Sequence, residues 1–120
     1  MHQKISSTQT ILYLDLENNK SKKVLAYAKS RRTKINIMDW KKEKLTTTMW
    51  KELLMKLKKE PKELMDKSKP YYRENIKGKD FKEEDWLNIL TNSPFLLKGP
   101  ILIEGENAIL CDNASNVFKF

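Results

Sequence analysis

Hydrophobic residues near the amino terminus follow the spacing of a strand, a helix and a second strand. Residues 10–16 are apolar at most positions and predict a buried strand. A helix is expected from about Ser21 to Ser30, and Thr33 to Trp40 predicts a second strand. Because the joints between them are short, these elements form a βαβ unit, whose crossover is right-handed in nearly all proteins.

The next part of the chain, about residues 46–92, predicts helices. One helix carries apolar side chains at the i, i+3, i+4, i+7 spacing of an amphipathic helix, namely Trp50, Leu53, Leu54 and Leu57. The threonines at 46–48 each offer it an N-cap. Pro61 begins a short helical piece, because its missing N–H costs little at a first helical position. Residues 67–79 are expected to be irregular.

A last helix of this segment ends at Ser93-Pro94. Two N-caps are compatible with its sequence. Asp80 has the spacing of a capping box, whereas Lys82 as the N-cap would bring Phe81 against Trp86 as a hydrophobic staple.

Two short uncharged runs near the carboxyl terminus predict a β-hairpin. Ile101–Ile103 and Ala108–Cys111 are joined by Glu104-Gly105-Glu106-Asn107, which is typical of a turn. Pro100 stands at the head of the first strand, where a missing N–H is tolerated. The form of residues 113–120 is left open. The whole order, βαβ, helices, then ββ, is that of an α/β domain.

Composition limits the chemistry that one chain can perform. The 120 residues predict one domain over 10–120 after a polar segment, 1–9. Cys111 is the only cysteine and His2 the only histidine, so an internal disulfide, a multi-cysteine metal site and a histidine triad are excluded. We expect no metal. No apolar run is long enough to cross a membrane and the first ten residues lack a signal-peptide core, so we expect a cytoplasmic protein.

The net charge of +8 comes from lysines spread along the whole chain. Such a distribution is typical of a solvated surface. A basic ridge at Lys56, Lys58, Lys59 and Lys62 keeps nucleic-acid binding as one alternative, but we do not expect nucleic acid to be a partner.

The order of these elements, with the motifs that they carry, resembles the arsenate reductase/Spx family of thioredoxin-like proteins. The resemblance lies chiefly in residues 80–90, 92–103 and 108–111, and Pro70-Tyr71 is similar to a Pro-Tyr pair of the family. It implies a thioredoxin-like fold with a central mixed sheet. It also implies a cis Gly99-Pro100 bond that faces the amino terminus of the first helix.

The family's chemistry implies a nucleophilic cysteine after the first strand and arginines that hold an oxyanion. Here Asn18 stands at the nucleophile's position, and Gly99 and Asp112 stand where two of the arginines are expected. No arginine precedes the Pro-Tyr pair closely enough to be the third. We therefore predict no catalytic residues, and the resemblance alone leaves open whether the chain is an enzyme.

We predict a non-catalytic module that binds a protein or peptide and that has a regulatory role. By analogy with Spx, RNA polymerase is one concrete partner. The alternative is a glutathione-dependent reductase or transferase in which bound glutathione is the only thiol, so glutathione is the one cofactor considered. We expect a monomer. The residues predicted to line the remaining cleft are Asn18, Asn19, Lys20, Lys98, Gly99 and Pro100.

Overall fold

The computed structural model describes residues 9–120, and most of the predicted polar segment 1–9, with His2, lies outside the described residues. Its centre is a four-stranded mixed sheet in the order β2-β1-β3-β4. β1 pairs parallel with β2 and antiparallel with β3, and β3 pairs antiparallel with β4. The strands are β1 (Thr10–Leu14), β2 (Asn36–Asp39), β3 (Ile101–Glu104) and β4 (Asn107–Leu110). The predicted α/β fold with a mixed sheet is thus present.

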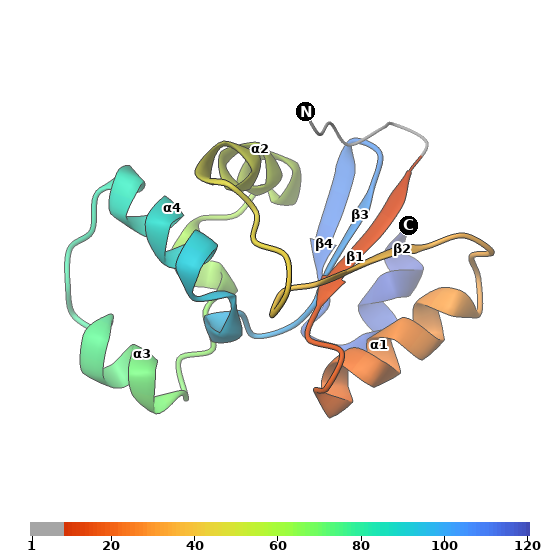
Figure 1. Ribbon diagram of the computed structural model, residues 1–120, viewed down its shortest axis with the longest axis horizontal. Coiled ribbons are helices and arrows are strands. Elements are labelled where there is room, and N and C mark those ends of the chain that lie inside the picture. Colours follow the sequence, from red (N-terminus) through yellow and green to blue (C-terminus); the bar gives the residue numbers. More distant parts are fainter. Residues whose placement is uncertain (1–8) are drawn as a thin grey trace.

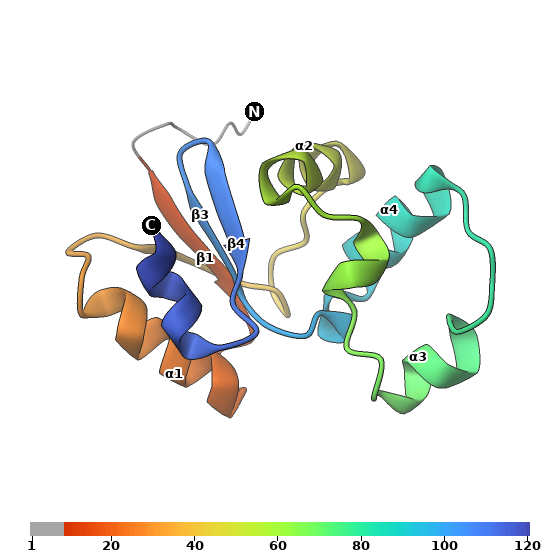
Figure 2. The same ribbon diagram turned by 180° about the vertical axis from the view of Figure 1, so that it is seen from behind.

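Helices cover both faces of this sheet (Figure 1). The α-helices are α1 (Asn19–Lys29), α2 (Thr47–Leu57), α3 (Pro70–Asn75) and α4 (Glu83–Asn92). Three 3-10 helices accompany them, η1 (Pro61–Leu64), η2 (Pro94–Leu96) and η3 (Ala114–Lys119). Seen from behind, η3 lies alongside α1 (Figure 2), where the rings of Tyr27 and Phe118 stack with centroids 5.6 Å apart.

Alternation along β1 divides the interior into two hydrophobic cores. Leu12 and Leu14 pack against α1 and η3, while Ile11 and Tyr13 face the opposite core, which α2, η1 and α4 complete. Trp50 of α2 is fully buried in that second core. The helical segment therefore closes one face of the sheet, and α1 with η3 closes the other.

Local sequence explains where the helices of this segment begin. The Thr46 hydroxyl accepts a hydrogen bond from the Met49 N–H at 3.1 Å, which makes Thr46 the N-cap of α2. Lys82 is the N-cap of α4, and the rings of Phe81 and Trp86 pack edge to face, 5.0 Å apart. Of the two N-caps that the sequence allowed for α4, the second is confirmed.

The hairpin turn is shorter than predicted. Glu104 and Asn107 are paired residues of the two strands, so only Gly105 and Glu106 form the loop. Gly105 has φ of +63°, a left-handed conformation that glycine adopts without steric cost.

Two sequence-based predictions are wrong. The chain is helical over Pro70–Asn75, where we expected irregular structure, because Pro70 begins the helix and the Tyr72 side chain is buried.

The second wrong prediction is the cis Gly99-Pro100 bond. This bond is trans, since the described residues contain no cis peptide bond. Here a glycine precedes the proline where the family pattern has an arginine, and its backbone lies so close to Cys111 that a Cβ would be 2.3 Å from the Cys111 carbonyl oxygen. Without a side chain, residue 99 fits against Cys111 through a trans bond.

Within residues 9–120, none of the helices has the length and apolar character needed to span a membrane.

Replacing Thr46 with alanine should destabilise the protein, because the Met49 N–H would lose its cap. The free energy of unfolding should fall by about 0.5–2 kcal/mol, the usual effect of losing an N-cap. Thr48→Ala is the matched control, since Thr48 is an exposed threonine two residues further along, within α2, and is not the cap. Urea denaturation followed by circular dichroism measures both variants. Equal losses in the two would show that the Thr46 cap does not stabilise α2.

Candidate functional site

The register of the sheet brings four chain segments together at one edge. Tyr13 pairs with Ile101, which in turn pairs with Leu110, and Leu14 pairs with Asp39. Since β1 and β3 are antiparallel, the end of β1 lies beside the start of β3. The loop into α1, the segment before β3 and the residues that follow β2 and β4 must therefore meet there.

The amino terminus of α1 points into this edge. Asn18 is its N-cap, and the Asn18 side chain accepts a hydrogen bond from the Ser21 N–H at 3.2 Å. The unpaired N–H groups of a helix amino terminus carry partial positive charge and favour anions. Asn18 already occupies one of these donors with its own amide oxygen.

Two adjoining hollows form a cleft at this edge, and Lys20, Asp66 and Lys98 line both of them. The smaller, of about 140 Å³, lies between Asn18, the N-cap of α1, and Pro100. The larger, of about 480 Å³, extends toward Lys59 and has mostly polar walls. We call this pair of hollows the cleft.

The Lys20 side chain reaches across the cleft and forms an ion pair with Asp112. Its ammonium group donates to the Lys98 carbonyl oxygen at 3.0 Å and to the Asp112 carboxylate at 3.2 Å. Both charged side chains remain about half exposed, so the pair contributes at most about 1 kcal/mol to stability. The cation here is thus held by acceptors of the protein itself.

A second charged group of the cleft is Asp66. A hydrogen bond from the Ser68 hydroxyl lowers the pKa of the Asp66 carboxyl below its ordinary value, and the charges of Lys69 and Lys20 act in the same direction. Asp66 is therefore an anion at neutral pH. An oxyanion in the cleft would meet this negative charge as well as that of Asp112.

Aromatic side chains form the rim on the side of α3 and η2. Phe95 is 42% exposed, contacts the Tyr71 ring edge to face at 5.4 Å and lies under the Lys69 ammonium at 5.8 Å. Trp40 lines the cleft from the end of β2, and its indole N–H is buried with no hydrogen-bond partner among the described residues. This side of the cleft offers ring surface and a lysine.

Gly99 is buried and lines the cleft with its backbone alone. Its neighbours are engaged, since the Lys98 N–H donates to Leu64 and the Pro100 carbonyl accepts from Cys111 at 2.7 Å. Within residues 9–120, no hydrogen bond to the N–H or C=O of Gly99 is found. A buried peptide group without a partner costs free energy, so an extended ligand strand that paired with Gly99 would be favoured.

The only thiol of the chain lies outside the cleft. Cys111 is fully buried in the core between the sheet and α1. Burial raises the pKa of the Cys111 thiol from 9.0 to about 11. At neutral pH it is a protonated, inaccessible side chain and a poor nucleophile.

The structure brings together five of the six residues that the sequence predicted for the cleft. Asn18, Lys20, Lys98, Gly99 and Pro100 all line the smaller hollow. The sixth, Asn19, is the exposed first residue of α1 and does not line it. Their binding role stays a prediction.

Sequence reasoning missed Lys69, Phe95 and the ion pair of Lys20 with Asp112. Lys69 directly precedes the Pro-Tyr motif, which was the one sequence feature that could have placed it. Among the described residues, no group of three or more His, Cys, Asp or Glu side chains could hold a metal ion.

The pKa of a cysteine introduced at position 18 should be lowered by the partial positive charge at the amino terminus of α1. Helix-terminal effects are about 0.3–1 kcal/mol, or up to ~2 when partly buried, so the pKa of the Asn18→Cys thiol should lie about one unit below ~8.5. Ser30→Cys is the matched control at the carboxyl end of α1, where no such lowering is expected. The pH dependence of iodoacetamide labelling, with Cys111→Ala in both variants, measures the two values. A pKa at or above that of the control would contradict an electropositive site at Asn18.

Comparison with known proteins agrees with this architecture. The family model described as "ArsC family" matches residues 13–120. The chain is similar in structure to a Yersinia pestis protein assigned as an arsenate reductase (TM-score 0.85, 18% identity, 93% of this chain and 100% of that one). It is also similar to an arsenate reductase from Vibrio cholerae (TM-score 0.84, 17% identity, 93% and 97%). No curated protein sequence matches. Since the family model covers nearly the whole chain, this protein belongs to the ArsC family.

Proposed function

We propose that this ArsC-family protein has lost the redox centre and binds an extended segment of a protein partner in the cleft. The single observation that carries this proposal is the state of the amino terminus of α1. There the family pattern implies a nucleophilic cysteine, and here the Asn18 amide caps the helix instead. An amide cannot attack arsenate or a disulfide.

The charges of the cleft support the same conclusion. The family pattern implies arginines that hold an oxyanion through charge-assisted hydrogen bonds. Arg31, Arg32 and Arg73 are the only arginines of the chain, and none of them lines the cleft. Arg32 is committed elsewhere, to Glu104 at 2.8 Å and to the Val117 carbonyl. An arsenate ion in the cleft would meet the carboxylates of Asp66 and Asp112 as well as lysines, and it would find no guanidinium group for a bidentate pair.

The groups that remain suit an extended peptide. The free N–H and C=O of Gly99 can pair with a peptide backbone without any particular side chain. Phe95 and Lys69 on the rim could contact an apolar and an acidic side chain of the same segment. By analogy with Spx, a cytoplasmic regulatory contact with RNA polymerase is one form of this proposal, with the protein acting as a monomer.

Glutathione-dependent catalysis is the second candidate, and the same Gly99 backbone favours it. Glutathione is itself a short extended peptide with carboxylates that Lys20 or Lys98 could bind. The two candidates differ in one property, because only the second requires glutathione to occupy the cleft.

Arsenate reduction should be absent. With arsenate, glutathione and glutaredoxin present, the protein should give no turnover above a buffer blank, because the cleft has neither thiol nor arginine. The Asn18→Cys variant should also fail, since one thiol does not replace the missing cations. A coupled assay of glutathione oxidation measures both. Turnover by the unaltered protein that disappears when Cys111 is alkylated would contradict the proposal.

Site-specific photo-crosslinking tests the binding surface. A benzoyl-phenylalanine should be placed at Phe95 on the rim and, as a matched control, at Phe120, since these two side chains are 42% and 41% exposed. Irradiation in a native extract should give a discrete adduct from position 95 that position 120 does not give. Mass spectrometry then identifies the partner.

Two further conditions decide between the candidates. If a protein is the partner, excess glutathione at millimolar concentration should leave the adduct at position 95 unchanged. Loss of that adduct with glutathione, together with amide shifts at Asn18 and Gly99, would favour the glutathione-dependent enzyme. Identical adducts from positions 95 and 120 would reject the cleft as the binding surface.

A further inference from the structure

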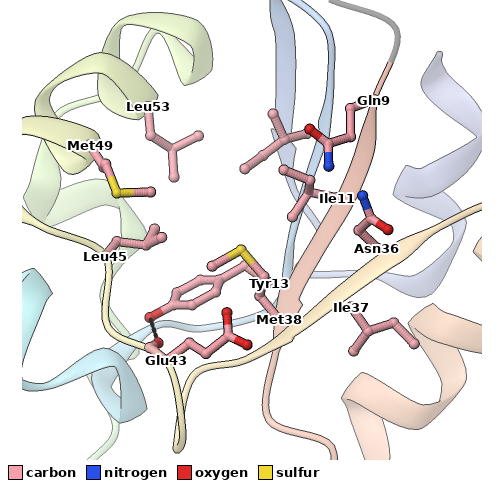
Figure 3. Close-up of a pocket in the computed structure, with 11 residues that line it drawn as sticks. Gln9, Ile11, Tyr13, Asn36, Ile37, Met38, Glu43, Leu45, Met49 and Leu53 are labelled. Carbon is pink, nitrogen blue, oxygen red and sulfur yellow. Dashed lines mark hydrogen bonds between the residues drawn. The ribbon is translucent and has the colours of Figure 1, made fainter. Parts of the chain in front are cut away.

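A second cavity, separate from the cleft, lies between strands β1 and β2 and helix α2. It has a volume of about 250 Å³ and shares no lining residue with the cleft. Figure 3 shows its side chains: Leu45, Met49 and Leu53 approach from the helical segment, and Ile11 and Met38 approach from the strands. The cavity is therefore a recess within the second hydrophobic core, open at its mouth.

The apolar walls of this cavity suit a small hydrocarbon body. Ile11, Leu45 and Leu53 are nearly fully buried, so they form fixed walls. Met38 and Met49 are partly buried, and their flexible thioethers adapt to ligands of different shape. Pockets for drug-sized ligands occupy roughly 300–1,000 Å³, and this cavity is slightly smaller. A short alkyl or single-ring body would fit.

The polar side chains of the cavity are separated into two groups. Glu43 and Tyr13 lie toward one end, and Gln9 and Asn36 lie toward the other (Figure 3). Of the described residues that line the cavity, only Glu43 carries a charge. Its negative charge favours a cationic ligand over an anionic one at that end of the cavity.

Tyr13 can assist a cation beside Glu43. Its hydroxyl donates a long hydrogen bond, 3.4 Å, to the Glu43 carbonyl oxygen, and the backbone of Leu45 hydrogen-bonds to the phenol oxygen, which leaves one lone pair of that oxygen to accept. Burial raises the pKa of the Tyr13 phenol above its ordinary value of 10.0, so the group stays neutral. Because Glu43 is exposed, an ammonium group beside it would keep part of its hydration and avoid a large desolvation cost.

We propose that this cavity binds a small apolar amine, with its hydrocarbon body between Ile11 and Leu53 and its ammonium group at Glu43 and the Tyr13 hydroxyl. The site is independent of the cleft. Burial of the hydrocarbon supplies most of the binding free energy, and Glu43 selects the charge.

Three probes of one chain length test the proposal: hexylamine, 1-hexanol and hexanoate. Each is titrated into the full chain, and binding is followed by NMR of the methyl groups. Hexylamine should shift the methyl signals of Ile11, Leu45 and Leu53 and should bind more tightly than hexanol by up to about fivefold, the upper end of what one exposed ion pair contributes. Hexanoate should bind most weakly.

Two charge variants locate the selectivity. Glu43→Gln should reduce hexylamine affinity to that of hexanol and leave hexanol binding unchanged. Glu52→Gln is the matched control, because Glu52 is an exposed glutamate of α2 that does not line the cavity. Equal affinity for all three probes, equal effects of the two variants, or shifts of the Leu97 methyl signals in the cleft instead of the cavity methyls would each overturn the proposal.

Discussion

Burial of β1 on both faces is the constraint on which the rest of the structure depends. Leu12 and Leu14 are fully buried against α1, while Ile11 and Tyr13 are buried against the helical segment. A shift of one residue in the pairing of this strand would exchange the two sets, and each would meet the wrong core. The register of β1 with both β2 and β3 is thereby fixed, and β4 follows through β3.

The cleft is a consequence of this register and does not depend on catalytic side chains. Once Tyr13 pairs with Ile101, the loop holding Asn18 must lie beside Gly99. The space there is narrow, since a Cβ at residue 99 would be 2.3 Å from the Cys111 carbonyl oxygen. With this backbone an arginine at position 99 has no room. Lys20 is one of the lysines that line the cleft, and Asp112 together with the Lys98 carbonyl holds its ammonium group.

The sequence predicted those features that depend on local chemistry or on the motifs of the family. Thr46 could be recognised as a cap from its place before an apolar helix, and the packing of Phe81 on Trp86 follows from residue spacing. The helix at Pro70–Asn75 was missed because only one of its residues, Tyr72, is buried. A single buried position gives no periodic apolar pattern in the sequence.

Features set by contacts between distant segments were the least predictable. The Gly99-Pro100 bond was predicted cis from the family motif, but its geometry depends on the approach of Cys111, twelve positions further along the chain. The Lys20 ion pair joins residues 92 positions apart. No local pattern encodes either contact, and both lie in the cleft, where four segments meet.

Aromatic side chains lie between the cleft and the second cavity. Tyr13 lines only the cavity and Trp40 only the cleft, and their rings meet edge to face with centroids 5.7 Å apart. Tyr13 also contacts Trp50 at 6.0 Å, so the three rings form a continuous buried wall. Side chains at the two mouths, Glu43 and Phe95, do not contribute to this wall. Substitutions there can therefore change one site without disturbing the packing that supports the other.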